Sequence, residues 1–539
     1  MPATHPPEAR SSARPPVRHG LVLVVTCLAL GAVVAAMSSL NVGLPLIARD
    51  THASQTQLSW IIDAYSLVFA SLLLPAGTLG DRFGRRRALL IGLTVFGAAS
   101  ACAPFTSDPD VLIGCRAVLG VGAALVMPAT LSTITGTFPR EQRARGVGVW
   151  AAVAGGSAVI GVLVSGVLLE FWSWEAIFVF NVVVAAVALV GTLLYVPESA
   201  DDNPPKVDVT GAVLVVAGLA VLVYSVIEAP VHGWSAARTL GGIAAGLVLV
   251  AGFVGWSLRR RDPLLDPRLF RNPRFAAASL SIMLQFFGFF GYIFVMMQYL
   301  QMIREDSALI AALSLLPMAV VMVPSARLAP RLTARLGVRG PWVTGLVLVA
   351  VGLATLAQLT EDSPYAFVAA GLVPLGIGMG IATTPATTAI TDALPKALQN
   401  VGSAMNDLSR ELGGALGIAV LGSVLSTGYR ENLELPGMPE HMAEAARSSF
   451  AAATAIGGPV VDPARSAFID GLHGALLGGA GVALVGAVVV FVLLGRPHHA
   501  AQDTGTPDTG AEDPGTEDPG TEATGAVPSV PSAGRRARR

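Results

Sequence analysis

Long apolar runs, separated by short polar stretches, occupy most of this chain. Each run is about 20 residues long, which is enough for a helix to cross a bilayer. The runs do not alternate and are far longer than barrel strands, so we expect helices, whose backbone groups bond internally in lipid. The fold class is therefore an all-α polytopic membrane protein. Its fourteen predicted spans cover residues 20–47, 58–79, 88–105, 110–132, 146–168, 175–195, 209–229, 238–257, 276–300, 308–326, 341–360, 365–389, 404–426 and 471–495.

The basic residues of the connecting segments predict how the chain is oriented. Segments on the cytoplasmic side of a membrane carry an excess of lysine and arginine. Here the arginines collect in alternate segments such as "DRFGRRR", whereas "FTSDPD", "EFWSWE" and "TEDSP" on the opposite side contain none. One inside segment, "PESADDNPPKVD", is acidic, but acidic residues have little weight in this rule. We expect a multi-pass protein of the plasma membrane with both termini in the cytoplasm.

The composition argues against several classes of function. Of the 539 residues, 53% are hydrophobic and 13% charged, and the net charge of −1 gives no field that would attract nucleic acid. The cysteines Cys27, Cys102 and Cys115 lie in apolar runs without the spacing of a metal site, so we expect small core residues there. The sequence also has no nucleotide-binding loop, metal cluster or nucleophile triad. We therefore predict neither an enzyme nor a cofactor.

The chain repeats itself once in each half. The stretch "LGDRFGRRRALLIGL" at 79–93 is similar to "LTARLGVRGPWVTGL" at 332–346, and "PATLSTITGTFP" at 128–139 is similar to "PATTAITDALP" at 385–395. Internal repeats in a helical membrane protein are typical of transporters, whose site lies between the repeats.

The repeat and the spans together predict the domain organisation. A cytoplasmic tail at 1–19 precedes an N-terminal bundle of six helices at 20–195. Two inserted helices at 209–257 are followed by a C-terminal six-helix bundle at 275–495, which contains an outer loop at 427–469. The tail at 496–539 is of low complexity and is expected to be disordered.

The stretch "GTLGDRFGRRRALL", residues 77–90, gathers one acid, four arginines and three glycines in a chain poor in charge. Its glycines allow tight turns and close backbone approach. Asp81 lies near helix ends, where a carboxylate can bond free N–H groups, and the arginines can pair with acids on a moving partner. A positive-inside anchor would explain the arginines, but it would not explain the acid and the glycines.

This stretch resembles the loop 2–3 signature of the major facilitator superfamily, and "LIGCRAVLGVGAALVMPATL" at 112–131 resembles that family's fourth-helix signature. The stretches "LNVGLPLI", "LSWIIDAYSLVFASLLLPAG" and "GSAMNDLSRELGGALGIAVLGSVLS" resemble the fourteen-helix drug:proton antiporter-2 family. The resemblance implies two six-helix bundles plus two extra helices, and export of drug-like or antibiotic molecules in exchange for protons, with the proton gradient as energy source. It also implies a conformational latch at Gly77, Gly80, Asp81, Arg82, Gly84, Arg85 and Arg86.

Two positions depart from the family pattern. Many members carry an aspartate where this chain has Ala36, and their fifth-helix motif has proline and glycine where this chain has Val162 and Ser165. The missing acid supports an alternative, in which the protein is a dedicated exporter or facilitator of a native metabolite, such as a self-made antibiotic, with different or no proton coupling. A non-transporting membrane scaffold is the remaining alternative.

Asp63 and Arg116 are the candidates for proton coupling. A charged residue at the centre of a membrane helix costs about 2.5–3.5 kcal/mol on insertion scales, so an acid there usually has a use. Burial disfavours its charged form. At ~1.5 Å per residue both side chains lie roughly 8–9 Å below the outer surface. They can therefore pair or compete, or form a static pair that fixes helix packing.

Polar and aromatic residues within the spans are the candidates for a substrate cavity. Aromatic faces and amides suit a large apolar or cationic ligand, although aromatic residues in membrane helices as often face lipid or pack. The partners we expect are such a substrate, protons and the bilayer, and the protein is expected to be a monomer. The candidates are Asn41, Trp60, Tyr65, Gln285, Phe286, Phe289, Asn406, Arg410 and Glu411.

Overall fold

The computed structural model describes residues 18–199, 208–261, 263–393 and 399–495, and this part of the chain is helical and has no strand. Short 3₁₀ turns occur at Ala103–Phe105, Pro267–Arg271 and Gly458–Val460, and a π-helical turn, η3, covers Tyr299–Ile303. The α-helices are α1 (His19–Thr51), α2 (Gln55–Phe83), α3 (Arg85–Cys102), α4 (Pro109–Thr137), α5 (Arg140–Phe171), α6 (Glu175–Tyr195), α7 (Val209–Ile227), α8 (Ala229–His232), α9 (Ala237–Arg259), α10 (Pro273–Gln298), α11 (Ala308–Leu313), α12 (Leu316–Leu336), α13 (Arg339–Leu356), α14 (Tyr365–Asp392), α15 (Gln399–Asn432), α16 (Glu440–Ser448), α17 (Phe450–Ile456) and α18 (Val461–Leu493).

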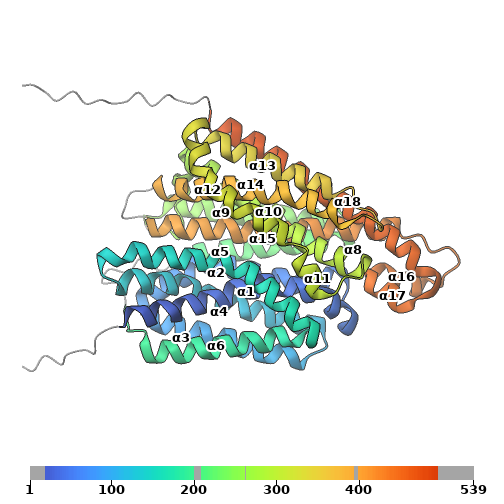
Figure 1. The fold of residues 1–539 in the computed structure, drawn as a ribbon, viewed down its shortest axis with the longest axis horizontal. Helices are drawn as coiled ribbons and strands as arrows, with labels where there is room; N and C mark the ends of the chain where they lie inside the picture. Colours follow the sequence, from blue (N-terminus) through green and yellow to red (C-terminus); the bar gives the residue numbers. More distant parts are fainter. Residues whose placement is uncertain (1–17, 200–207, 262, 394–398, 496–539) are drawn as a thin grey trace, which may run out of the picture. The chain divides into compact units, whose positions relative to one another are not determined.

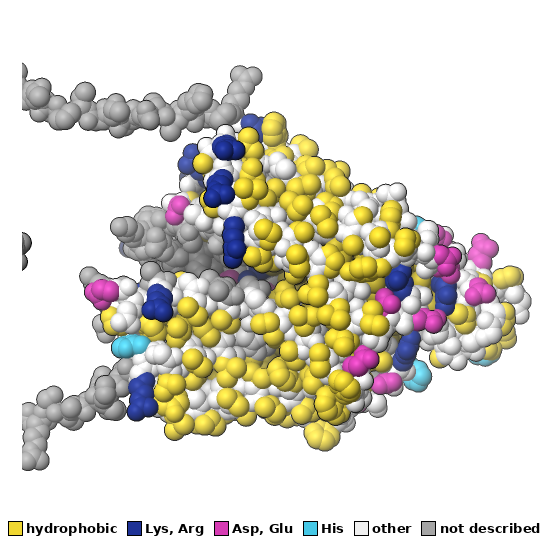
Figure 2. All heavy atoms as spheres, viewed as in Figure 1, with side chains coloured by type: hydrophobic (Ala, Val, Ile, Leu, Met, Phe, Trp, Pro, Cys, Tyr) yellow, Lys and Arg dark blue, Asp and Glu magenta, His cyan; other side chains and the backbone are white. Residues whose placement is uncertain are grey.

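The helices have the length and composition of membrane spans. Among the described residues, 13 helical segments are long and apolar enough to cross a bilayer, and α5 contributes a shorter apolar stretch, Gly156–Phe171. Each predicted span lies on one of these helices or passes its end by a few residues, except that 308–326 is divided between α11 and α12. Figure 2 shows hydrophobic side chains over the middle of one face and charged side chains at its two ends. The predicted all-α polytopic membrane fold is confirmed.

Two groups of helices build the described structure (Figure 1). Helices α1–α6 pack on one another and form the N-terminal half, and α10–α15 with α18 form the C-terminal half. The halves meet where α2 packs on α15 and where α5 packs on α11. Helices α7 and α9 pair with each other as an insert, and α7 contacts both α2 and α15. We call the end with the arginine-rich segments, which the charge pattern predicts to be cytoplasmic, the inner end, and the opposite end the outer end.

The sequence repeat has the same structural role in both halves. Gly84 and Gly337 both have positive φ angles, 115° and 69°, at the turns that join α2 to α3 and α12 to α13. A Cβ atom on Gly92 would lie 2.9 Å from the Gly122 carbonyl oxygen, and one on Gly345 would lie 2.7 Å from that of Gly378. Corresponding glycines therefore bring α3 close to α4 and α13 close to α14.

Asp208 fixes the inner end of the insert. Its carboxylate accepts hydrogen bonds from the Gly211 N–H (3.0 Å), the Trp256 indole (3.0 Å) and the Leu264 N–H (3.4 Å), and lies 3.5 Å from Arg260. Burial alone would raise the pKa of Asp208, but these hydrogen bonds and the arginine charge outweigh it and leave the pKa below its ordinary value. One buried carboxylate thus joins α7, α9 and the segment that leads to the C-terminal half.

We expect Asp208→Asn to lower the free energy of unfolding by about 1–2 kcal/mol at neutral pH, because an amide has no charge to pair with Arg260 and lacks the second acceptor oxygen that bonds the Leu264 N–H. Since the folded pKa lies below the unfolded one, the carboxylate stabilises the fold above the unfolded pKa of about 4, and this stabilisation is lost as the pH falls through the folded value. Thermal unfolding in detergent should therefore show a constant difference between wild type and variant from pH 6 to 8, and a smaller one below about pH 4. The exposed Glu170→Gln serves as control. Equal unfolding midpoints for wild type and Asp208→Asn at pH 7 would contradict the assignment.

Candidate functional site

A cavity of about 210 Å³ lies between the two halves towards the inner end. Its walls come from α2, α4 and α5 of the N-terminal half, from α15 of the C-terminal half and from the segment after α9. Apolar side chains such as Leu73 and Met127 cover much of the wall, and Trp150 adds an aromatic ring. Two carboxylates, Asp81 and Asp407, also line it. A cavity with apolar walls, an aromatic ring and a few polar groups is typical of a small-molecule site.

Each of these carboxylates is paired with an arginine. Asp81 Oδ1 lies 3.0 Å from Arg85 Nε, and Asp407 Oδ1 lies 3.7 Å from Arg410 Nη2. Arg410 also lies 3.5 Å from Glu411 Oε1, so it stands between two carboxylates of α15. Asp407 and Glu411 are buried, and Oε2 of Glu411 has no hydrogen-bond partner. The cavity wall therefore carries acidic groups whose countercharges come from arginine side chains of the same half.

Several predicted cavity residues form a connected polar strip in the C-terminal half. Gln285 of α10 accepts a hydrogen bond from the Thr383 hydroxyl (2.6 Å) in α14, and Asn406 of α15 accepts one from the Thr387 hydroxyl (3.0 Å). The Arg410 guanidinium lies 5.7 Å from the centre of the Phe286 ring, which is within the range of a cation–π contact. The structure thus brings together Gln285, Phe286, Asn406, Arg410 and Glu411 in the half that contributes Asp407, but none of the five is among the residues that line the inner cavity.

The other predicted cavity residues lie elsewhere. Asn41 is buried in the N-terminal half, where its amide donates to carbonyls of its own helix. Tyr65 is also buried there, and its hydroxyl donates to the Val33 carbonyl (2.8 Å). Phe289 packs with Phe286 and Phe290 in a cluster of aromatic rings. Trp60 lines a different pocket at the outer end.

Asp63 and Arg116 are both buried but do not form an ion pair. Arg116 Nε donates to the Ile61 carbonyl (2.8 Å), Nη1 donates to the Ala36 carbonyl (3.3 Å), and the guanidinium lies 4.4 Å from the centre of the Tyr65 ring. Neither carboxyl oxygen of Asp63 has a hydrogen-bond partner, and among the described residues no ion pair includes it. The static pair that the sequence leaves open is therefore absent from the structure.

The residues of the predicted latch make their contacts within the N-terminal half. Gly84 makes the turn, and the arginines after it contact the end of α6: Arg86 donates to the Leu193 carbonyl (2.8 Å), and Arg87 lies 3.6 Å from Glu198. Arg82 lies over the Phe83 ring and Gly80 packs on Ala88. Gly77 and Asp81 line the cavity, and Asp81 pairs with Arg85. Every described hydrogen bond and ion pair of the latch stays inside this half.

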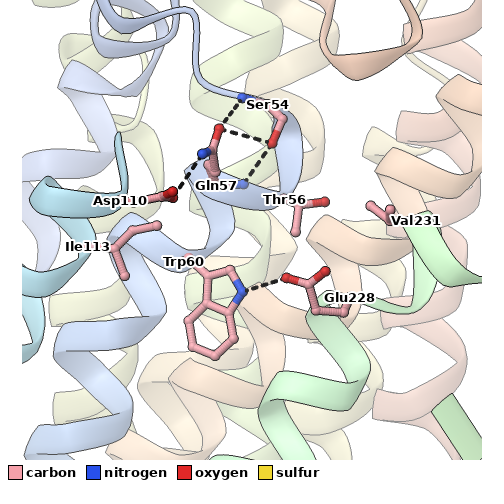
Figure 3. A pocket seen from close by; sticks show the side chains of 8 residues that line it. All are labelled: Ser54, Thr56, Gln57, Trp60, Asp110, Ile113, Glu228 and Val231. Atoms are coloured by element: carbon pink, nitrogen blue, oxygen red, sulfur yellow. Dashed lines mark hydrogen bonds between the residues drawn. The ribbon is translucent and has the colours of Figure 1, made fainter. Parts of the chain in front are cut away.

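A second pocket, of about 590 Å³, lies at the outer end beside the insert (Figure 3). The Trp60 indole donates to Glu228 Oε1 (3.2 Å), which joins α2 to the insert. Gln57 caps α2 together with Ser54, and its amide donates to Asp110 at the start of α4 (2.9 Å). These contacts connect the outer ends of three segments.

Sequence reasoning missed two residues that the structure places in these pockets. Trp150 lines the inner cavity, but it stands in "GVWAAV", a stretch that matches none of the quoted motifs. Glu228 holds Trp60 at the outer pocket. Its signal was an acid at the very end of the seventh predicted span, where solvated charges are ordinary.

Comparison with known proteins agrees with this architecture. The family model described as "Major Facilitator Superfamily" matches residues 26–418. The chain is 35% identical over 496 residues to the multidrug efflux pump LfrA of Mycolicibacterium smegmatis, and the match covers 90% of this chain and 98% of LfrA. It is 30% identical to the tetracenomycin C resistance and export protein of Streptomyces glaucescens, with 88% and 92% of the two chains covered. It is 34% identical to the methyl viologen resistance protein SmvA of Salmonella typhimurium, with 87% and 96% covered.

Solved structures show the same fold. A bacterial homologue of the human lysosomal transporter Spinster, crystallised in an inward-facing and unoccupied conformation, superimposes with a TM-score of 0.64 at 17% identity. The match covers 88% of this chain and 96% of that one. With the family model, the relatives and the two packed helical halves, it follows that the chain belongs to the major facilitator superfamily and is a membrane transporter, not an enzyme.

Proposed function

We propose that this protein exports drug-like cations across the plasma membrane in exchange for protons, as a monomer with both termini in the cytoplasm. Its relatives are named for multidrug efflux and for antibiotic or methyl viologen resistance, and export of such molecules is the function they support. The observation that carries the cationic preference is the inner cavity, with apolar walls, Trp150 and the carboxylates Asp81 and Asp407. The arginine-rich inner segments support the orientation.

Asp63 is the proposed proton carrier. Its side chain is fully buried, and neither oxygen accepts a hydrogen bond. An ionised carboxylate in such a place would lose its hydration without compensation, so this arrangement suits a neutral, protonated carboxyl group. Arg116, which donates to two backbone carbonyls and forms no described ion pair, is the group proposed to stabilise the ionised form of Asp63 during the transport cycle.

Arg410 links cation binding to a second carboxyl group. It stands between Asp407, which lines the cavity, and Glu411, which does not. A cation that binds Asp407 competes with Arg410, which then pairs more fully with Glu411 and its free oxygen. This favours ionised Glu411 and release of its proton. Substrate binding and proton binding thus become alternatives at one cluster, as an exchanger requires.

We expect Asp407→Asn to raise the KM for methyl viologen about tenfold, because the cation loses its direct countercharge. The KM for a neutral substrate should rise much less. Uptake into inverted membrane vesicles, measured over a range of substrate concentrations, checks both. Glu141→Gln, at an exposed position near the inner end of α5, is the control: it also removes one negative charge, but outside the cavity. Equal KM changes for the charged and the neutral substrate would show that Asp407 is not a cation-binding group.

A dedicated exporter remains the second candidate function. Ala36 stands where many members of the resembled family have an acid. Its backbone carbonyl accepts a hydrogen bond from Arg116. One relative is named for resistance to and export of a single antibiotic, tetracenomycin C. A panel of chemically unrelated dyes and drugs separates the two functions. Transport of several of them supports the broad exporter, and transport of none supports the dedicated one.

A further inference from the structure

The outer ends of the two halves are joined by one buried hydrogen bond. Gln301 Nε2 in the C-terminal half donates to the Val42 carbonyl oxygen in α1, at 2.8 Å. Gln301 is 7% exposed and Val42 is fully buried. Of the hydrogen bonds and ion pairs that the structure describes, no other runs directly from the N-terminal to the C-terminal half. Apolar groups of the two halves also meet, as where Gly414 approaches Met37.

Gln301 belongs to the π-helical turn η3, which continues α10. The Arg304 N–H bonds the Tyr299 carbonyl five residues earlier, at 3.1 Å. A π turn has more residues per turn than an α-helix and therefore points its side chains in other directions. Gln298, three residues earlier on regular α-helix, donates its amide to the Phe294 carbonyl of its own helix instead. Such turns are rare and are found frequently at functional sites.

The π turn is fixed firmly to its own half. The Tyr299 hydroxyl donates to the Thr360 carbonyl (2.7 Å), and Arg304 Nη1 donates to the Ser363 carbonyl (2.6 Å), both in the segment between α13 and α14. Arg304 also lies 3.3 Å from Asp306. The backbone of Gln301 is therefore held on both sides, and its side chain is the part that reaches the other half.

We propose that Gln301 is a positioning residue that closes the outer end of the transporter while the inner cavity is open. The inference rests on the alternating-access cycle of the proposed function, in which the outer ends must part to release substrate. The Gln301–Val42 bond has to break in that step. Because an intramolecular hydrogen bond contributes about 0.5–1.5 kcal/mol, its loss should shift the ratio of outward-open to inward-open molecules about twofold to tenfold towards the outward-open form.

Spin labels on the outer surface test this assignment. The exposed positions Asp50, at the outer end of α1, and Asp362, between α13 and α14, take one label each in a chain whose native cysteines have been replaced. Pulsed electron–electron double resonance then gives the distribution of distances between the two labels, one on each half. In Gln301→Leu, which keeps the size but removes the amide, we expect the long-distance population to increase about twofold to tenfold relative to the short one.

Gln298→Leu is the matched control, because it removes a buried amide one turn away whose described hydrogen bond stays within its own helix. It should leave the distance distribution unchanged, and both variants should unfold at midpoints close to each other. An unchanged distribution in folded Gln301→Leu, or the same shift in both variants, would overturn the inference. Since no proton or substrate gradient is needed, the result is independent of whether Asp63 carries the proton.

Discussion

Asp63→Asn should abolish transport driven by a pH gradient while leaving the protein folded and present in the membrane. An asparagine has nearly the same shape, and it can occupy the buried site of Asp63, where neither carboxyl oxygen is bonded. It cannot bind and release a proton. Inverted vesicles with an acidic interior should therefore accumulate methyl viologen with the wild-type protein and show background uptake with the variant.

The control for this experiment is Asp50→Asn, at an exposed position on the outer end of α1. It should transport like the wild type at equal expression. Normal uptake by Asp63→Asn, with the same dependence on pH, would make Asp63 structural and would leave Glu411, the second carboxyl group of the proposal, as the proton-coupling group.

Arg116→Met should abolish transport without lowering thermal stability. Arg116 is a buried charge whose ligands are two carbonyl groups and an aromatic ring, with no acid among them. Replacing a buried charge by an apolar side chain of similar length is often neutral or stabilising, because its desolvation penalty disappears. We expect a buried charge that does not stabilise the fold to serve transport.

Two measurements on one sample check this second prediction. The unfolding midpoint in detergent should be equal to or above that of the wild type, and vesicle uptake should fall to background. The exposed Arg145→Met, at the inner end of α5, controls for loss of an arginine as such. If the unfolding midpoint of Arg116→Met lies well below that of the wild type, the two hydrogen bonds of Arg116 stabilise the fold and its role is structural.

Hydrophobic length was sufficient to predict the spans, since a bilayer requires about 20 apolar residues of every helix. The exception is instructive: span 308–326 is interrupted at Ser314 and Leu315, which are turn residues between α11 and α12. Composition alone does not show this break, because the residues on both sides are equally apolar. The sequence repeat corresponds to a structural repeat, because Gly84 and Gly337 both stand at turns whose positive φ angles favour glycine.

The candidate site could be predicted only where its residues are neighbours along one helix. Asp407, Arg410 and Glu411 lie within two turns of α15, and their shared face follows from spacing alone. Asp63 and Arg116 were placed at similar depth, but depth does not say which way a side chain points around its helix. Arg116 points to carbonyl groups instead. The bond of Gln301 depends on a π turn, which no local residue pattern predicts.

The most direct test of the central proposal, proton-driven export of cations, is methyl viologen uptake by purified wild-type protein in liposomes with an imposed pH gradient. Proton-driven export predicts that an acidic interior drives accumulation against the concentration gradient, that protons leave as the cation enters, and that collapse of the gradient stops uptake. Uptake that continues unchanged after the gradient has collapsed, or that moves no protons, would contradict it.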